Sequence, residues 1–175
     1  LGIGEFGLRL KNSRSIRVTK RHKMPEFRGH HPVYHHGLIP NASGYNTAKN
    51  EFRVFYQINS LGMRDREYSP TKPLSTYRIL ALGDSFTEGY SSELNDSFIK
   101  QLERKLNKLP PKRGSKYEVA NLGVAGFSPL LVLLRFKEFL HKLPGHLVLL
   151  NLDGSDFADD YFYEKGAIRD GDGEI

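Results

Sequence analysis

The stretch Tyr77-Arg-Ile-Leu-Ala-Leu-Gly-Asp-Ser-Phe-Thr-Glu-Gly-Tyr90 decides the fold. Residues 79–82 form an apolar run that is too short for a helix and is typical of a central strand buried on both faces. Gly83 then permits a tight turn, and the next helix is predicted to begin at Ser85. Unpaired N–H groups at such a turn can stabilise an oxygen that becomes an anion. Ser85 is therefore placed where a nucleophile is expected.

A simpler interpretation is that Asp84 or Ser85 only caps the following helix, which is the commonest role of these residue types at a strand-to-helix turn. The longer pattern favours a chemical role. Gly83-Asp84-Ser85-x-Thr87-x-Gly89 directly after a strand resembles the first block of the SGNH, or GDSL, hydrolases. This resemblance implies a serine esterase or acyl-transfer enzyme whose nucleophile is Ser85, supported by Gly83 and Asp84.

Predicted helices and strands alternate after this stretch. They are a helix that Asn95 or Asp96 caps and that ends near Leu109, a strand over Lys116–Leu122, a helix from Ser128 to Leu143, and a strand over His146–Leu152. This order predicts an α/β fold with a mainly parallel, doubly wound sheet. The family resemblance implies the same three-layer α/β/α, flavodoxin-like arrangement. Ligands bind beyond the carboxyl ends of such strands, where Ser85, Gly126 and residues 153–156 would gather.

Two details of the predicted helices concern single residues. In the helix that ends near Leu109, the spacing assigns Phe98 to the apolar face and Lys100 to the solvated face. In the next helix, Ser128 is predicted to be the N-cap because Pro129 follows it.

The turn after the second predicted strand carries glycines at regular places. A glycine there lets a backbone N–H approach a substrate without a side chain in the way. Asn121-x-Gly123-x-x-Gly126 is also similar to the second block of the family. The resemblance implies that Gly126 donates to the oxyanion beside Ser85, with Asn121 and Gly123 in support.

The third block of the family is Gly-x-Asn-Asp, and this chain has Asp153-Gly-Ser-Asp156 at the corresponding place. The resemblance then implies that Ser155 is a third oxyanion donor through its hydroxyl and that Asp156 supports the site. Asp156, Asp159 and Asp160 could instead hold a hard cation through oxygen ligands. We favour a capping and solvating role for these carboxylates, and we predict neither a metal nor a cofactor.

A general base for Ser85 is missing from the sequence. Serine needs an adjacent base that a third group orients, and the family supplies both from a late Asp-x-x-His block. His141 and His146 are predicted to lie away from the site. The resemblance therefore predicts that the catalytic Asp and His lie beyond Ile175, and that this length of chain is weakly active or inactive.

The N-terminal part is predicted to be a basic extension, 1–76, in front of an incomplete hydrolase core, 77–175. Glu51–Ile58 is rich in aromatic and β-branched residues and is predicted to be a strand. The following Asn-Ser-x-Gly-x-Arg-Asp string is similar to a segment that precedes the serine block in many bacterial members. We interpret it as a structural turn held by a network between Arg64 and Asp65.

Four histidines occur within residues 30–36. Imidazole is the commonest metal ligand, so this cluster invites a metal-site interpretation. Adjacent histidines point apart in an extended chain, however, and the neighbouring sequence offers no carboxylate to complete a ligand set. We therefore favour a surface loop.

The composition limits the classes of function. The chain has 175 residues, enough for one domain, and no cysteine, which excludes disulfides and thiolate catalysis. Its formal net charge is +6, and residues 1–40 carry the whole excess with eight Lys or Arg and two Asp or Glu. This basic arm lacks a recognisable nucleic-acid-binding pattern, so we expect no nucleic-acid partner. An anionic surface is a weaker alternative.

The sequence favours hydrolysis or transfer of an acyl ester, with a small-molecule, glycan or lipid ester as substrate. The alternative is a non-catalytic module that binds a glycan or an acyl group in the same strand-end pocket. A removed membrane anchor upstream of Leu1 stays open, and an extracytoplasmic or membrane-anchored location is slightly favoured for the parent protein. The oligomeric state is not readable from the sequence.

Overall fold

A parallel three-stranded sheet forms the centre of the protein. The computed structural model describes residues 24–110, 116–154 and 156–169, with the side chains of 156–159 and 162 excepted. The strands are β5 (Thr76–Leu82), β6 (Lys116–Asn121) and β7 (Leu147–Leu150), in the order β6-β5-β7. The predicted central strand is confirmed, because Ile79 in β5 pairs with Val119 on one side and Leu147 on the other.

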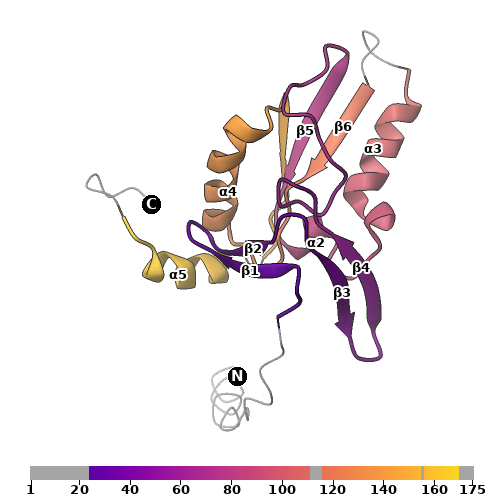
Figure 1. Cartoon of the computed structure of the whole chain (residues 1–175). Coiled ribbons are helices and arrows are strands. Elements are labelled where there is room, and N and C mark those ends of the chain that lie inside the picture. Colours follow the sequence, from indigo (N-terminus) through magenta and orange to yellow (C-terminus); the bar gives the residue numbers. More distant parts are fainter. Residues whose placement is uncertain (1–23, 111–115, 155, 170–175) are drawn as a thin grey trace, which may run out of the picture.

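Helices lie on both faces of the sheet. The described part of the chain has α2 (Ser85–Glu88), α3 (Phe98–Lys108), α4 (Pro129–Lys142) and α5 (Asp156–Gly166), with a short 3-10 turn, η1, over Leu94–Asp96. Figure 1 shows α3 and α4 on opposite sides of the sheet. An α/β architecture with a parallel sheet is therefore present, as predicted.

The start of α3 differs from the prediction. Asn95 and Asp96 belong to η1, and the cap is Ser97, whose side chain accepts from the N–H of Lys100. The two faces of the helix also differ. Phe98 is 41% exposed, whereas Lys100 is only 6% exposed, because buried acceptors surround its ammonium group and satisfy it.

Two hairpins precede the sheet. Strands β1 (Arg28–His31) and β2 (His35–Leu38) pair antiparallel, as do β3 (Ser43–Ala48) and β4 (Phe52–Gln57). The histidine cluster thus forms a hairpin, so the prediction of a surface loop was wrong. Figure 1 shows both hairpins near the end of the sheet where α2 begins. The predicted strand over residues 51–58 is confirmed, and the basic arm up to residue 23 lies outside the described residues.

One hydrophobic cluster joins the hairpins to the rest of the protein. Phe27 and Tyr56 are fully buried in the same cluster as Leu80 of β5 and Phe139 of α4. Residues on both sides of position 76 therefore share a core. No helix among residues 24–110, 116–154 and 156–169 is long and apolar enough to cross a membrane.

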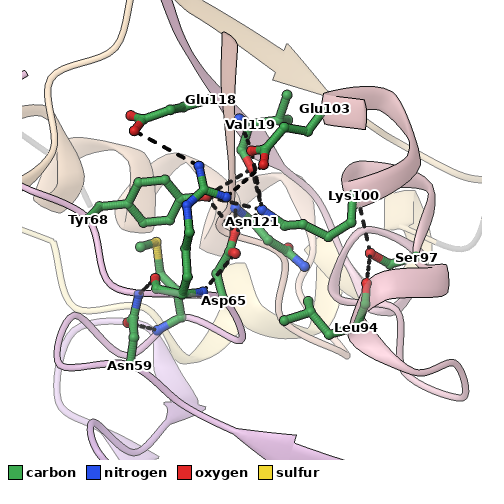
Figure 2. A network of polar contacts seen from close by, with 12 residues as sticks. Asn59, Asp65, Tyr68, Leu94, Ser97, Lys100, Glu103, Glu118, Val119 and Asn121 are labelled. Carbon is green, nitrogen blue, oxygen red and sulfur yellow. Dashed lines mark hydrogen bonds and ion pairs between the residues drawn. The ribbon is translucent and has the colours of Figure 1, made fainter. Parts of the chain in front are cut away.

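A buried carboxylate links the loop after β4 to the sheet. Asp65 accepts from the hydroxyl of Tyr68 at 2.9 Å and from the N–H of Asn121 at 3.0 Å, and it pairs with Lys100 at 2.7 Å (Figure 2). Lys100 also donates to the carbonyl of Val119 at 2.8 Å. This network fixes the end of β6, from which the glycine-containing turn departs.

Candidate functional site

The turn at the end of β5 accepts only a glycine at its first position. A Cβ on Gly83 would lie 2.3 Å from Oγ1 of Thr87 and 2.8 Å from the carbonyl oxygen of Asn151. Its own carbonyl accepts from the N–H of Val124 at 3.1 Å. The loops that follow β6 and β7 therefore close on the turn from both sides and hold Ser85 at the edge of the sheet.

Of the two residues that could cap the helix, Asp84 is the one that does so. Asp84 caps α2, because its Oδ1 accepts from the N–H of Phe86 at 3.0 Å. Ser85 is the first residue of the helix, is half-buried, and donates from Oγ to Oδ2 of Asp84 at 3.2 Å. Asp84 is therefore the helix cap, and Ser85 does not cap the helix.

Ser85 and Gly126 line one cleft of about 490 Å³. The other lining residues are Met24, Arg28, His35, His36, Tyr90, Ala125 and Tyr163. The structure thus brings the turns after β5 and β6 together, as the parallel topology requires. It also adds the hairpin β1–β2 and helix α5, which the sequence did not place at this site.

Two of the residues that line this cleft, Ser85 and Gly126, have unpaired backbone N–H groups. Within the described ranges 24–110, 116–154 and 156–169, neither the N–H of Ser85 nor that of Gly126 donates to another group of the protein. Gly126 has a φ of 82°, a conformation that favours glycine. Unpaired donors of this kind can hold an oxygen that develops negative charge.

Glu88, three residues after the serine, is one of the residues near this site that the sequence analysis missed. Its side chain is fully buried, and it accepts from the hydroxyl of Tyr56 at 2.7 Å and from the N–H of Ala125 at 2.7 Å. It also pairs with Arg28 of β1. The carboxylate therefore connects α2, both hairpins and the glycine turn. Burial, and next the charge of Glu88, raise the pKa of Tyr56, which keeps its hydroxyl protonated as a donor.

Arg64 and Asp65 bind different parts of the structure and form no ion pair with each other. The guanidinium of Arg64 is buried and donates to the carbonyl oxygens of Gly89 at 2.5 Å and Ser92 at 2.8 Å. It fixes the end of α2, while Asp65 fixes the end of β6 through Asn121. The loop is structural, as interpreted, but the expected Arg64–Asp65 network was wrong.

Asn121 and Gly123 shape the turn after β6. Oδ1 of Asn121 accepts from the N–H of Gly123 at 3.0 Å. A Cβ on Gly123 would lie 2.3 Å from the backbone nitrogen of Glu88 and 2.6 Å from the carbonyl carbon of Thr87. Glycine is required here because the turn after β6 lies directly on α2.

The third block lies partly outside the described residues. This applies to Ser155 and to the side chain of Asp156.

Asp160 in α5 accepts from the N–H of Leu130 at 2.8 Å and so caps α4. Ser128 is the N-cap residue of α4 and Pro129 follows it, as predicted, but the hydroxyl of Ser128 makes no capping hydrogen bond. No metal-binding group of three His, Cys, Asp or Glu occurs in the part of the chain that the structure describes.

The two C-terminal histidines lie away from Ser85, as predicted. His146 lies at the amino end of the sheet, where its Nδ1 accepts from the N–H of Arg78 at 3.0 Å and its ring stacks on Tyr77. His141 is in the last turn of α4. In the described part of the chain, no histidine is hydrogen-bonded to Oγ of Ser85.

A second cleft of about 580 Å³ adjoins the first, and His35 and Tyr163 line both. Most of its other lining residues are apolar side chains of the β1–β2 turn, α4 and the end of α5, among them Val33, Leu131 and Leu134. Beside the cleft of Ser85 there is thus room for an apolar group.

Comparisons with known proteins gave similarity to esterases over part of the chain. No model of a known protein family matches the sequence. No curated protein matches it either. Among solved structures, it is similar to a point mutant of the esterase AlinE4, with 29% identity and a TM-score of 0.42 over 50% of this chain and 45% of that one. A crystal structure of AlinE4, described as an SGNH-hydrolase family esterase, gives 27% identity and a TM-score of 0.41 over 53% and 46%. The chain spans less than half the length of these esterase chains, and at these TM-scores the likeness assigns neither fold nor activity.

Proposed function

We propose that this chain carries the nucleophile and part of the oxyanion hole of an SGNH-type α/β hydrolase with a three-layer, doubly wound core. One observation supports the proposal above all. Ser85 stands at the carboxyl end of the central strand and lines the same cleft as Gly126, and the N–H groups of both residues are unpaired among the described residues. A nucleophile beside two backbone donors is the arrangement that acyl transfer requires.

In the proposed reaction, Oγ of Ser85 attacks the carbonyl carbon of an ester. The carbonyl oxygen takes the electron pair and is held by the N–H groups of Ser85 and Gly126, and Ser155 is the proposed third donor. The carbon–oxygen bond to the alcohol then breaks, and the proton from Oγ leaves with the alcohol. Water, or a second alcohol in a transfer reaction, releases the acyl group from Ser85.

Ser85 needs a general base to take the proton of Oγ, and the described residues place no such base beside it. Oγ donates to Asp84, whose other oxygen caps α2. General-base assistance is typically worth about 10²- to 10⁴-fold in rate. We therefore expect residues 1–175 alone to acylate slowly, and to do so at Ser85 before any other serine.

The test is covalent labelling of the chain with a fluorophosphonate, followed by peptide mass spectrometry. We expect the label on Ser85, and its loss in Ser85→Ala. Ser91 is the matched control, because it is exposed and lies shortly after α2 in the chain. The oxyanion donors should favour Ser85 over Ser91 by about 10²-fold, since one such donor is worth about 10² to 10³. Equal labelling of wild type and Ser85→Ala would disprove the proposal.

The non-catalytic alternative predicts a different result. A module that only binds a glycan or an acyl group would bind its ligand equally well with Ser85→Ala and would form no adduct in the wild type. The second cleft supports this alternative as well as the first proposal, because its apolar lining can hold an acyl group without chemistry. Labelling together with ligand binding therefore separates the two functions.

A further inference from the structure

His36 makes two hydrogen bonds that together define its protonation state. Its Nε2 lies 2.9 Å from the carbonyl oxygen of Ala125. A carbonyl oxygen only accepts, so Nε2 carries the proton and donates. Its Nδ1 lies 3.0 Å from Nδ1 of His35. In the neutral ring this nitrogen is an acceptor, and the proton between the two rings therefore belongs to His35.

His36 is thus occupied at both nitrogens and is not the missing base of Ser85. Its ring is half-buried and packs edge-on against Phe127 at 5.2 Å between centroids. A Cβ on Gly126 would lie 3.4 Å from Nε2, in ordinary contact. The imidazole therefore packs against the turn that contains Gly126, and its Nε2–H donates to that turn.

The hydrogen bond from His36 is accepted by the carbonyl of Ala125, which belongs to the same peptide group as the N–H of Gly126. The N–H of Phe127 donates to the carbonyl of Val124 at 3.1 Å, which closes a β-turn with Ala125 and Gly126 in the middle. Gly126 has a φ of 82°, and Ala125 is not among the residues with positive φ. This combination is a type II turn.

Type I and type II turns differ by a flip of their central peptide. The carbonyl of Ala125 and the N–H of Gly126 belong to that one planar trans peptide, so they point in opposite directions. Whatever holds the carbonyl therefore also sets where the N–H points. The peptides on either side are held separately, because Ala125 donates to Glu88 and Tyr163 donates to the carbonyl of Gly126 at 3.2 Å.

We propose that His36, on the N-terminal hairpin, is a positioning residue that holds the turn in the type II form and so keeps the N–H of Gly126 directed into the Ser85 cleft. This inference rests on the proposed function for its effect on rate, but not for its effect on the turn. Residue 36 is brought to the second block by the tertiary fold alone, 89 positions away along the chain.

The variants for the test are His36→Leu, which removes the donor, and His36→Gln, whose amide nitrogen can donate from nearly the same place. His141→Gln is the matched control, because His141 is exposed in the last turn of α4. Two measurements are made on the whole chain. One is the rate of Ser85 acylation by 4-nitrophenyl acetate at increasing ester concentration. The other is the ¹⁵N–¹H signal of Gly126 by NMR, with relaxation dispersion.

With His36→Leu we expect the saturating acylation rate to fall about tenfold, the weight of one hydrogen bond in a two-state turn, with KM changed less than about twofold. The Gly126 signal should shift and show exchange broadening. His36→Gln should restore both to within about threefold of the wild type, and His141→Gln should change neither. A role in general packing would not be rescued by Gln, whose shape differs from that of the ring.

The proposal is overturned if His36→Leu leaves the Gly126 signal unchanged, or if His36→Gln alters it as much as Leu does. If Leu prevents folding, the wild-type imidazole decides, because a ring whose proton resides on Nδ1 instead of Nε2 contradicts the donor role. Absence of any adduct on wild-type Ser85 would refute the proposed function, while the Gly126 signal would still confirm or overturn the role of His36.

Discussion

Replacing Glu88 by glutamine tests whether one buried carboxylate holds the serine helix, the hairpins and the glycine turn together. In the native protein this carboxylate receives bonds from Tyr56 and Ala125, both at 2.7 Å, and pairs with Arg28. A carboxamide keeps the shape but has one accepting oxygen, and its NH₂ group faces a donor. At least one native bond is therefore lost, together with the negative charge opposite the guanidinium.

The expected loss of unfolding free energy is about 3 kcal/mol. Breaking a buried pair by removing one partner typically costs about 3–5 kcal/mol, and a hydrogen bond to a charged group contributes about 1.5–3 kcal/mol. The lower end applies here, because the Arg28 side chain is 10% exposed and water can reach part of it. Glu88→Ala would leave every donor unpaired and should cost more.

The assay is equilibrium unfolding in urea followed by far-UV circular dichroism, since the chain has no tryptophan. The urea dependence of the free energy should stay constant while the midpoint falls. Glu51→Gln is the matched control, because Glu51 is exposed in the turn between β3 and β4, and it should change stability by less than about 0.5 kcal/mol. A loss below about 1 kcal/mol for Glu88→Gln would refute the reasoning.

Three further predictions concern stability. Lys100→Met should cost about 3 kcal/mol in the same urea assay, because it leaves a buried carboxylate without its cation, whereas Lys105→Met on the exposed face should be nearly neutral; equal effects would contradict the buried role. Gly123→Ala should cost at least about 1–3 kcal/mol, because the added Cβ would meet the backbone of α2, and Gly154→Ala, with open space around it, should leave the melting temperature unchanged. Burial lowers the pKa of His36, so the folded state binds its proton more weakly than the unfolded chain. The stabilising contribution of the neutral ring is then complete above about pH 6.5 and is lost as the pH falls through the folded pKa. His36→Gln should flatten the fall in urea midpoint on acidification, and an unchanged slope would show that other groups cause it.

Local pattern predicted the elements of the core well. An apolar run of four residues is too short for a helix, and the glycine after it permits a tight turn, so β5 and the start of α2 at Ser85 could be predicted from the local sequence. Buried polar partners could not be read in this way. The helical spacing of Lys100 assigns it to the solvated face. It is buried nonetheless, because the loop after β4 supplies Asp65 and strand β6 supplies the carbonyl of Val119 as partners for its ammonium group.

The sequence by itself determined the α/β order and the place of Ser85, because both depend on periodicity and turn chemistry within a few residues. Only the tertiary structure decided what surrounds the serine. Arg28 and His36 come from a hairpin about fifty residues earlier, and they reach Glu88 and Ala125 because the hairpin folds back over the strand ends. Such contacts depend on how separate elements pack against a shared core, and no local pattern records them.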